Sequence, residues 1–408
     1  MHMTVRETNA NNILGCIAAR INLTTLLCLT LLLEPKLFVK FPAINYFYIA
    51  GAVAVFCVVM AELMRCRIKL GKFFVFALLY RLAIFPQTVL QNGELLDWGY
   101  YTLTLLALIG YFESMADAKE RLSGIDNVAF LLLLYLFLNY VVLLIAPGGV
   151  IDGLYFLGYR TRIVEVIIVA IVSSAYVDCC LHKCSFRTVF FCLIGLIQIV
   201  ILWVATAVVG LAVLVLSLLA FRYSKGLCKP TFFHVITLAG IVATIAFCIF
   251  NVSFLFSGFI QSVLHKSASL SDRTYIWALA VQMFKASPLL GYGVVDNGNH
   301  ILWVTNWMSM YWQAHNNILQ ILLDGGLLSF IPYLAMLFYV GGELRKKHLS
   351  GVFLAVILSA WLAINVMAVS EIFVLQNYFF LFLIIILIAC SDCGYFLSGE
   401  IPEVGHEI

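Results

Sequence analysis

The stretch Phe186–Phe221 reads FRTVFFCLIGLIQIVILWVATAVVGLAVLVLSLLAF and contains one charged residue, Arg187. A helix of roughly 20 apolar residues crosses the hydrocarbon core of a bilayer, which is about 30 Å thick. The stretch is too long for one crossing helix and long enough for two short helices joined by a tight turn. We therefore predict spans at 186–203 and 204–221, which indicates a chain that crosses a membrane more than once.

The composition of the whole chain agrees with this prediction. Of its 408 residues, 63% are hydrophobic and 11% are charged, and the mean hydropathy is +1.04. Soluble globular domains carry about 25% charged residues, so a soluble protein is excluded and an all-α polytopic integral membrane protein is predicted. The net charge of +3 comes from loop residues and does not indicate nucleic acid as a partner. Apolar runs predict about twelve transmembrane helices, at 12–33, 43–64, 73–90, 96–112, 127–146, 163–180, 186–203, 204–221, 233–255, 316–340, 351–369 and 373–390.

The distribution of Lys and Arg predicts the orientation of the chain, because short cytoplasmic loops are enriched in them. Alternate connections on one side hold clusters such as Arg65–Lys72, Arg222–Lys229 and Arg345–Lys347, and the opposite side holds half as many basic residues. We therefore expect both termini to be cytoplasmic and the connection between spans nine and ten to be a large external loop. The predicted parts are an N-terminal bundle of nine spans (1–255), the external loop (256–315) and the last three spans with a short cytoplasmic tail (316–408).

The cysteines and the spacing of possible metal ligands indicate neither disulfide bonds nor a bound metal. None of the twelve cysteines lies in a predicted external connection, so no disulfide framework is expected. No spacing typical of metal ligands is recognised, and no Gly-rich loop that cradles phosphate is present. We therefore expect neither a metal nor a cofactor.

The predicted external loop contains a short helix. Ser269, followed by Asp272, is typical of a helix start, and Pro288 provides a stop. Between them Arg273 and Trp277 lie one helical turn apart on an amphipathic pattern. On periodicity alone, the alternative remains that Trp277 anchors the helix at the membrane surface while Arg273 contacts lipid headgroups.

A histidine and three arginines form the candidate site. His315 lies where the loop enters the tenth span, and a neutral imidazole can accept a proton from a hydroxyl group near physiological pH. Arg160, Arg162 and Arg273 lie on the predicted external side, where positive charge is depleted, and guanidinium groups bind phosphate oxygens bidentately. The alternatives are a helix-capping histidine and arginines that reach the headgroups.

Three charged residues fall inside predicted spans. Arg81, Glu62 and Glu165 are expected to face the bundle interior or each other, because a charge facing lipid costs several kcal/mol. Structural pairing is the expected role for all three.

Motifs of the loop resemble a known family. The segments Asp272–Trp277 (DRTYIW) and Ser287–Gly293 (SPLLGYG), followed by His315 and Asn316, resemble in their order the large external loop of the O-antigen polymerase and O-antigen ligase superfamily. The specific likeness covers roughly residues 269–340, and a weaker one covers 156–211. In the weaker region many relatives carry a Ser-Arg pair, which this chain lacks.

Two details of the resemblance favour the polymerase branch. The ligase pattern is His, then Asn, Ser or Gln, nine free residues, Gly, two more, and Gly, Thr or Val. His315, Asn316 and Gly326 match this pattern, whereas Ser329 departs from it. In addition, the segment with Asp272 is similar to the polymerase form Gly-Arg-Thr-x-Ile-Trp.

The resemblance implies a helical, metal-independent glycosyltransferase of the GT-C type on the outer face of a bacterial cytoplasmic membrane. It implies a polysaccharide polymerase that joins undecaprenyl-pyrophosphate-linked oligosaccharide repeat units of an O-antigen, capsule or exopolysaccharide, alongside a chain-length regulator and a flippase of the same pathway. By analogy, His315 activates the acceptor hydroxyl, and Arg160 and Arg273 hold the departing pyrophosphate. The residues expected to contact the substrate are Arg162, Trp277, Tyr292 and Asn316, with Arg162 expected to matter less than Arg160.

Two other functions remain open at this stage. An O-antigen-type ligase uses the same chemistry and passes the glycan to a different acceptor. A flippase or transporter of lipid-linked oligosaccharides is the more distant alternative, but such proteins typically contain internal repeats and broken helices, and no repeat is evident between the halves of this sequence.

Overall fold

The computed structural model describes residues 21–182, 185–224, 226–250, 273–294, 302–304, 308–311, 313–347 and 351–392, and the single residues 252, 255, 258, 262 and 349. This part of the chain forms thirteen α-helices, a short 3-10 helix and two ribbons of paired strands. The helices are α2 (Leu23–Leu32), η1 (Lys36–Lys40), α3 (Pro42–Arg65), α4 (Lys72–Leu90), α5 (Leu95–Glu113), α6 (Ala118–Ile145), α7 (Ile163–Cys180), α8 (Phe186–Leu202), α9 (Ala205–Tyr223), α10 (Phe232–Cys248), α12 (Arg273–Ala286), α13 (Asn317–Lys346), α14 (Gly351–Ala368) and α15 (Asn377–Ser391).

The helices coincide with the predicted spans. Every predicted span contains one of these helices, although the first part of span 12–33 lies outside the described residues. Seven helices of the described part are long and apolar enough to cross a membrane, namely α3, α4, α6, α7, α9, α13 and α14. The protein is therefore a polytopic, helical membrane protein, and twelve crossings stay a prediction.

Two short antiparallel ribbons were not predicted. β1 (Leu154–Tyr155) pairs with β2 (Gly158–Tyr159), and β3 (Leu302–Val304) pairs with β4 (Met308–Tyr311). Both lie in connections between helices, where a pair of strands satisfies backbone groups locally.

The apolar stretch that begins at Phe186 forms two helices, as expected. Helix α8 ends at Leu202, and α9 begins at Ala205. Between them the backbone of Trp203 adopts the left-handed region, with φ of 44°, which reverses the chain within two residues. The prediction of two helices joined by a tight turn is confirmed.

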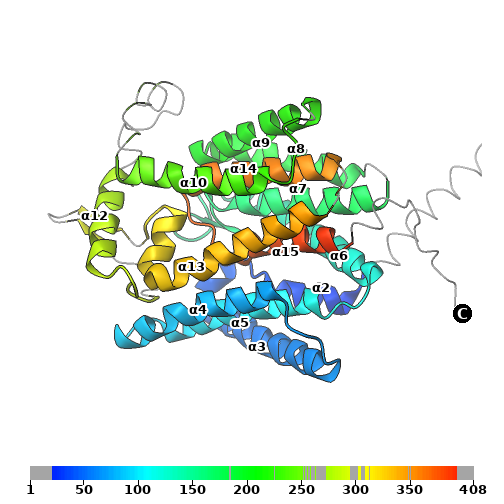
Figure 1. Ribbon diagram of the computed structural model, residues 1–408, viewed down its shortest axis with the longest axis horizontal. Helices are drawn as coiled ribbons and strands as arrows, with labels where there is room; N and C mark the ends of the chain where they lie inside the picture. The colour runs from blue at the N-terminus through cyan, green and yellow to red at the C-terminus, as the bar shows by residue number, and fades with distance from the viewer. Residues whose placement is uncertain are drawn as a thin grey trace, which may run out of the picture.

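The core of the bundle is built around α7 and α15. Nearly every side chain of α15 is buried, because this helix packs against α5, α7 and α13, and Figure 1 shows it in red near the middle of the bundle. On one side α14 packs against α9, α10 and α7. The ring of Trp361 on α14 stacks on Phe233 of α10 with 4.7 Å between ring centroids. Close packing of this kind holds the surrounding helices rigidly in place.

The charged residues inside the predicted spans differ in their burial and in their partners. Arg81 is buried and donates to the Thr102 hydroxyl at 3.0 Å and to the Trp98 carbonyl oxygen at 3.2 Å. Glu165 is also buried and pairs with Arg162. The expectation was wrong for Glu62, whose side chain is exposed in the last turn of α3. A position near a helix end allows a carboxylate to reach the interface, so burial is not required.

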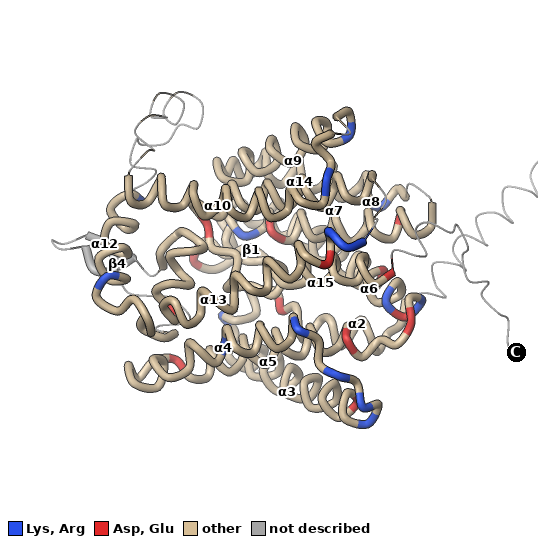
Figure 2. The backbone as a smooth tube through the Cα atoms, in the orientation of Figure 1, with Lys and Arg blue, Asp and Glu red and all other residues tan. Residues whose placement is uncertain are grey.

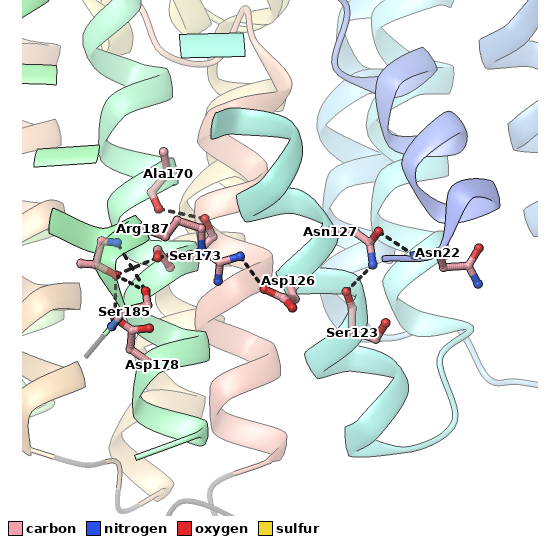
Figure 3. A network of polar contacts seen from close by, with 11 residues as sticks. Asn22, Ser123, Asp126, Asn127, Ala170, Ser173, Asp178, Ser185 and Arg187 are labelled. Carbon is pink, nitrogen blue, oxygen red and sulfur yellow. Dashed lines mark hydrogen bonds and ion pairs between the residues drawn. The ribbon is translucent and has the colours of Figure 1, made fainter. Parts of the chain in front are cut away.

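Most basic residues gather at the end of the bundle that lies away from α12, as Figure 2 shows for the described residues. A polar network joins three helices at this end (Figure 3). Arg187 of α8 pairs with Asp126 of α6 at 2.6 Å. The Thr188 hydroxyl donates to Asp178 of α7 at 2.6 Å. This arrangement matches the grouping of charges expected from the loops, and the assignment of this end to the cytoplasm stays a prediction.

Candidate active site

The candidate site centres on His315, which lies directly before α13. Its backbone adopts φ of 47°, a region that non-glycine residues rarely occupy. Trp277 of α12 donates its indole N–H to the His315 carbonyl oxygen at 3.4 Å. On the other side, the Asn316 side chain caps α13 by accepting from the Leu319 N–H at 2.9 Å. Contacts on both sides therefore hold His315 in a strained conformation, which is typical of functional sites.

Asn316 also ties this point to the rest of the bundle. Its side chain is fully buried and donates to the Val369 carbonyl oxygen at 2.9 Å. It donates as well to the sulfur of Cys248 at the end of α10, at 3.5 Å. The residue thus joins α10, α13 and the segment after α14, and it fixes where His315 lies.

The imidazole of His315 is half-buried and makes no hydrogen bond with any residue in the described part of the chain. Burial, together with the positive charges of Arg273 and Arg162, lowers the pKa of His315 to about 3. The ring is therefore neutral at physiological pH and has a nitrogen lone pair available to accept a proton.

Arg162 lies directly before α7 and is buried. Its guanidinium pairs with Glu165 at 3.0 Å and donates to the Gln313 side-chain oxygen at 3.2 Å. Because Gln313 is two residues before His315, this bond ties the start of α7 to the segment that carries the histidine. The cost of burying the guanidinium is offset by its carboxylate partner.

Arg273 approaches the site from the first turn of α12. Its guanidinium pairs with Glu371, a buried residue, at 2.7 Å. The segment after Glu371 is held by Asn317 of α13, whose side-chain oxygen accepts from the N–H groups of Phe373 and Val374 at 2.8 and 3.0 Å. The remaining N–H donors of Arg273 have no partner among the residues that the structure describes.

Arg160 lies apart from this group. It is exposed in the link between β2 and α7 and has no ion pair within the described ranges. Its charge is not among those that act on His315, whereas the charge of Arg162 is. The structure therefore brings Arg162 and Arg273 to His315, and it does not bring Arg160 there.

Trp277 and Tyr292 contact protein groups. The Trp277 side chain is fully buried, so it is not an anchor at the membrane surface. The Tyr292 hydroxyl donates to the Met283 carbonyl oxygen at 2.8 Å, and its backbone N–H donates to the Leu323 carbonyl oxygen at 2.7 Å. Both residues hold α12 against α13 and thereby position Arg273 and His315.

Helix α13 is broken at the motif glycine. Gly326 adopts φ of 60° and ψ of −154°, and a Cβ atom there would lie 2.3 Å from the Leu289 carbonyl group. The Leu327 N–H, freed by the break, donates to the Pro288 carbonyl oxygen at 2.9 Å. Ser329, which departs from the family pattern, donates its hydroxyl to the Ile321 carbonyl oxygen at 2.9 Å. The motif residues therefore dock the chain after α12 onto α13.

The expected helix between Arg273 and Phe284 is present as α12, which ends at Ala286, shortly before Pro288. Ser269 and Asp272, expected at its start, lie outside the described residues.

The sequence did not predict three residues of the site. Glu371 and Gln313 were not singled out, and Glu165 was assigned to structural pairing only. Glu371 is a lone charge in the short connection between the last two predicted spans, and this isolation in an apolar setting was the available signal. Nothing in the spacing connects these residues to His315, because they come from distant parts of the chain.

No group of three or more His, Cys, Asp or Glu side chains suited to a metal is found in the described part of the protein. The site therefore consists of a neutral imidazole, two guanidinium groups and two carboxylates, held by α7, α12, α13 and the segment after α14.

Part of the chain is similar to known proteins. Residues 189–334 match the family model Wzy_C, described as O-antigen ligase. A protein of Rickettsia felis named "Putative polysaccharide ligase" is 28% identical over 120 residues, which cover 28% of this chain and 30% of the relative. No solved structure matches this chain.

The protein is thus a polytopic membrane protein in which residues 189–334 are similar to the O-antigen ligase family. The expected resemblance to the O-antigen polymerase and ligase superfamily is confirmed. The matched range contains Arg273, Trp277, Tyr292, His315 and Asn316. Arg160 and Arg162 precede it.

Proposed function

We propose that the protein is a glycosyltransferase that joins oligosaccharide repeat units carried on undecaprenyl pyrophosphate. The observation that carries this proposal is the neutral imidazole of His315, which lies in the range matched by the family model and within the field of Arg162 and Arg273. A neutral base next to two guanidinium groups suits a reaction in which a hydroxyl loses a proton while a diphosphate leaves.

The chemistry follows from these groups. His315 accepts the proton of the acceptor hydroxyl as its oxygen forms a bond to the anomeric carbon of the donor glycan. The bond between that carbon and the pyrophosphate oxygen breaks, and the leaving oxygen keeps the electron pair. Arg273 and Arg162 neutralise the charge that develops on the diphosphate. No nucleotide is needed, because the lipid pyrophosphate is already an activated leaving group.

The two arginines also couple donor binding to the basicity of His315. Their positive charges lower the pKa of His315, and a bound diphosphate places negative charge against the same groups. Opposite charge nearby favours the protonated imidazole, so the pKa of His315 rises when the donor is present. The histidine is then a stronger base in the complex that reacts than in the free protein.

The finer features of the proposal concern the membrane. We place the reaction on the external face of a bacterial cytoplasmic membrane, with both termini cytoplasmic and about twelve GT-C-like spans. The end of the bundle that carries His315 holds few basic residues, which supports this orientation. A flippase and a chain-length regulator of the same pathway are the expected partners.

A ligase is the second candidate. It is supported by the names of the matching family and of the Rickettsia felis relative, both of which say ligase. A ligase would use the same imidazole and guanidinium groups on a different glycolipid acceptor.

The test is turnover by purified protein in proteoliposomes supplied with lipid-linked repeat units and no metal or nucleotide. His315→Ala is expected to reduce turnover about 10²–10⁴-fold, the usual contribution of a positioned base. His234→Ala is the matched control, because His234 lies on α10 and contacts the Phe338 carbonyl oxygen at 3.3 Å. It should retain normal turnover.

Product ladders of normal length from His315→Ala would remove the histidine from the mechanism. Product that forms only when an unrelated glycolipid acceptor is added would identify a ligase. Absence of any glycan product from the wild-type protein under both conditions would overturn glycosyl transfer itself.

A further inference from the structure

A second group of buried polar atoms lies beside the ends of α2, α5 and α15. The side-chain oxygens Glu34 Oε1, Gln376 Oε1 and Tyr378 OH are buried and have no hydrogen-bond partner among the described residues. The three residues are only 5%, 7% and 3% exposed. The other carboxylate oxygen of Glu34 accepts from the Tyr100 hydroxyl at 2.9 Å. Buried polar atoms nearly always have partners, so three unpartnered ones together require an occupant.

The same side chains line one hollow in the protein, together with Tyr100, Tyr101 and Lys36. The ammonium group of Lys36 lies 5.0 Å from the ring centroid of Tyr101. The hollow has a volume of about 20 Å³, and roughly 10–15 Å³ is enough for one water molecule. It therefore admits one oxygen-sized group and excludes a whole sugar ring.

The unpartnered atoms define the chemistry of that group. Glu34 Oε1 and Gln376 Oε1 are oxygens that accept hydrogen bonds, and the Tyr378 hydroxyl can donate or accept. The occupant must therefore offer a donor to these acceptors and also interact with a phenol. A hydroxyl group donates to one of the two oxygens and accepts from the Tyr378 phenol, and a water molecule occupies the place when no ligand is bound.

Electrostatic interactions connect the hollow with the site around His315. Tyr378 lies within electrostatic range of both Glu34 and Glu165. Glu165 pairs with Arg162 and carries a further buried oxygen, Oε2, without a partner in the described chain. The Arg162 guanidinium is thus linked to the hollow through its ion pair with Glu165 and the electrostatic influence of Glu165 on Tyr378.

We propose that this hollow recognises one hydroxyl group of a glycan substrate and displaces a water molecule to bind it. The inference rests on the proposed glycosyl transfer and adds to it a determinant of sugar specificity. A site that hydrogen-bonds a substrate hydroxyl discriminates strongly against an analogue without it, because its own buried groups then lose their partner.

Tyr378→Phe tests the proposal, because the Tyr378 hydroxyl has no partner in the described protein. The probe is the repeat-unit oligosaccharide of the producing cell, released from its lipid and titrated onto the purified full-length protein. We expect the affinity of the variant for this probe to fall about tenfold, as for the loss of one hydrogen bond. The Tm of the unliganded variant should not fall, because no bond within the protein is lost.

Ser359→Ala is the matched control. Ser359 on α14 also carries a buried hydroxyl without a partner in the described residues, but it does not line the hollow. Its substitution should leave the affinity for the probe unchanged. Equal affinity in the wild type and in Tyr378→Phe would overturn the proposal and leave a water molecule as the sole occupant.

Turnover separates this inference from the proposed function. The concentrations of the donor glycan and the acceptor glycan are varied separately. In Tyr378→Phe the KM for only one of the two glycans should rise, and that glycan is the one whose hydroxyl group binds in the hollow. If the wild-type protein forms polymer and both KM values of Tyr378→Phe equal those of the wild type, the inference is refuted and the proposed function stands. Wild-type protein that binds the probe but never transfers glycan would refute the proposed function alone.

Discussion

His315 shows how neighbouring side chains fix the conformation of a single residue. A non-glycine residue in a sparsely populated backbone region costs about 1–3 kcal/mol and persists only where its surroundings impose it. Here Trp277 binds the His315 carbonyl oxygen, and Asn316 caps the helix that follows. Asn316 follows His315 directly, and its amide fixes the exit of the chain from the histidine.

The electrostatics of His315 predict an unusual pH dependence. The acid limb of kcat/KM reports the pKa of the free enzyme, and the pKa of His315 is about 3. The imidazole stays neutral as the pH falls through 6.5. We therefore expect kcat/KM of the wild type to remain constant down to about pH 4. Arg273→Gln removes a positive charge that lowers this pKa, and the acid limb should therefore move to higher pH.

The measurement is kcat/KM for a short acceptor between about pH 4 and pH 8. Lys285→Gln serves as the control, because it removes a positive charge from the last turn of the same helix α12, and the charge of Lys285 is not among those that act on His315. A wild-type limb near pH 6.5, or a limb that does not move in Arg273→Gln, would contradict this account.

At the scale of elements, the break in α13 explains the motif glycine. Backbone groups freed inside a membrane bundle need new partners, and here the chain after α12 supplies them through the carbonyl groups of Pro288 and Leu289. Gly326 permits the close approach, and Ser329 satisfies a carbonyl of the first segment. The break thus joins α12, which carries Arg273, to α13, which follows His315 in the chain.

Gly326→Ala is expected to destabilise this junction. The new Cβ would lie 2.3 Å from the Leu289 carbonyl group, and alanine disfavours a φ of 60°, so the loss of stability should reach about 1–3 kcal/mol. Gly342→Ala is the control on the same helix, because nothing lies within 4 Å of a Cβ there. The Tm of the solubilised variants checks this difference, and a Tm for Gly326→Ala equal to that of Gly342→Ala would show that the glycine is not required.

At the scale of the whole molecule, the bundle places its charges asymmetrically. Most basic residues lie at the end away from α12, while His315, Arg162 and Arg273 lie together at the other end. From the positive-inside tendency we predict that the candidate site faces the external side.

Thiol labelling in whole cells tests this orientation. Cysteines introduced at Asp152, which is exposed beside β1, and at Ser370, after α14, should react with a membrane-impermeant reagent. The native cysteine Cys66, exposed at the end of α3, should not react. Asn299, a further position in the predicted external loop, lies outside the described residues. In inverted vesicles the pattern should reverse, and labelling of Cys66 in intact cells would place the site on the cytoplasmic side.

Much of the architecture is encoded locally. The helices, the turn at Trp203 and the short helix from Arg273 follow from apolar runs and periodicity, because a bilayer demands long apolar helices whatever they pack against. The motif of His315, Asn316 and Gly326 could likewise be read from the sequence, because its three residues lie close together in the chain.

Only the tertiary structure decided which groups meet. Arg160 and Arg162 are two residues apart and indistinguishable by composition, yet one is exposed and the other is buried next to the histidine segment. Glu371 reaches Arg273 across 98 positions of sequence. The sequence by itself therefore determined a polytopic bundle and a family motif, while long-range packing decided the electrostatics of His315, because charges act through distances in space and not along the chain.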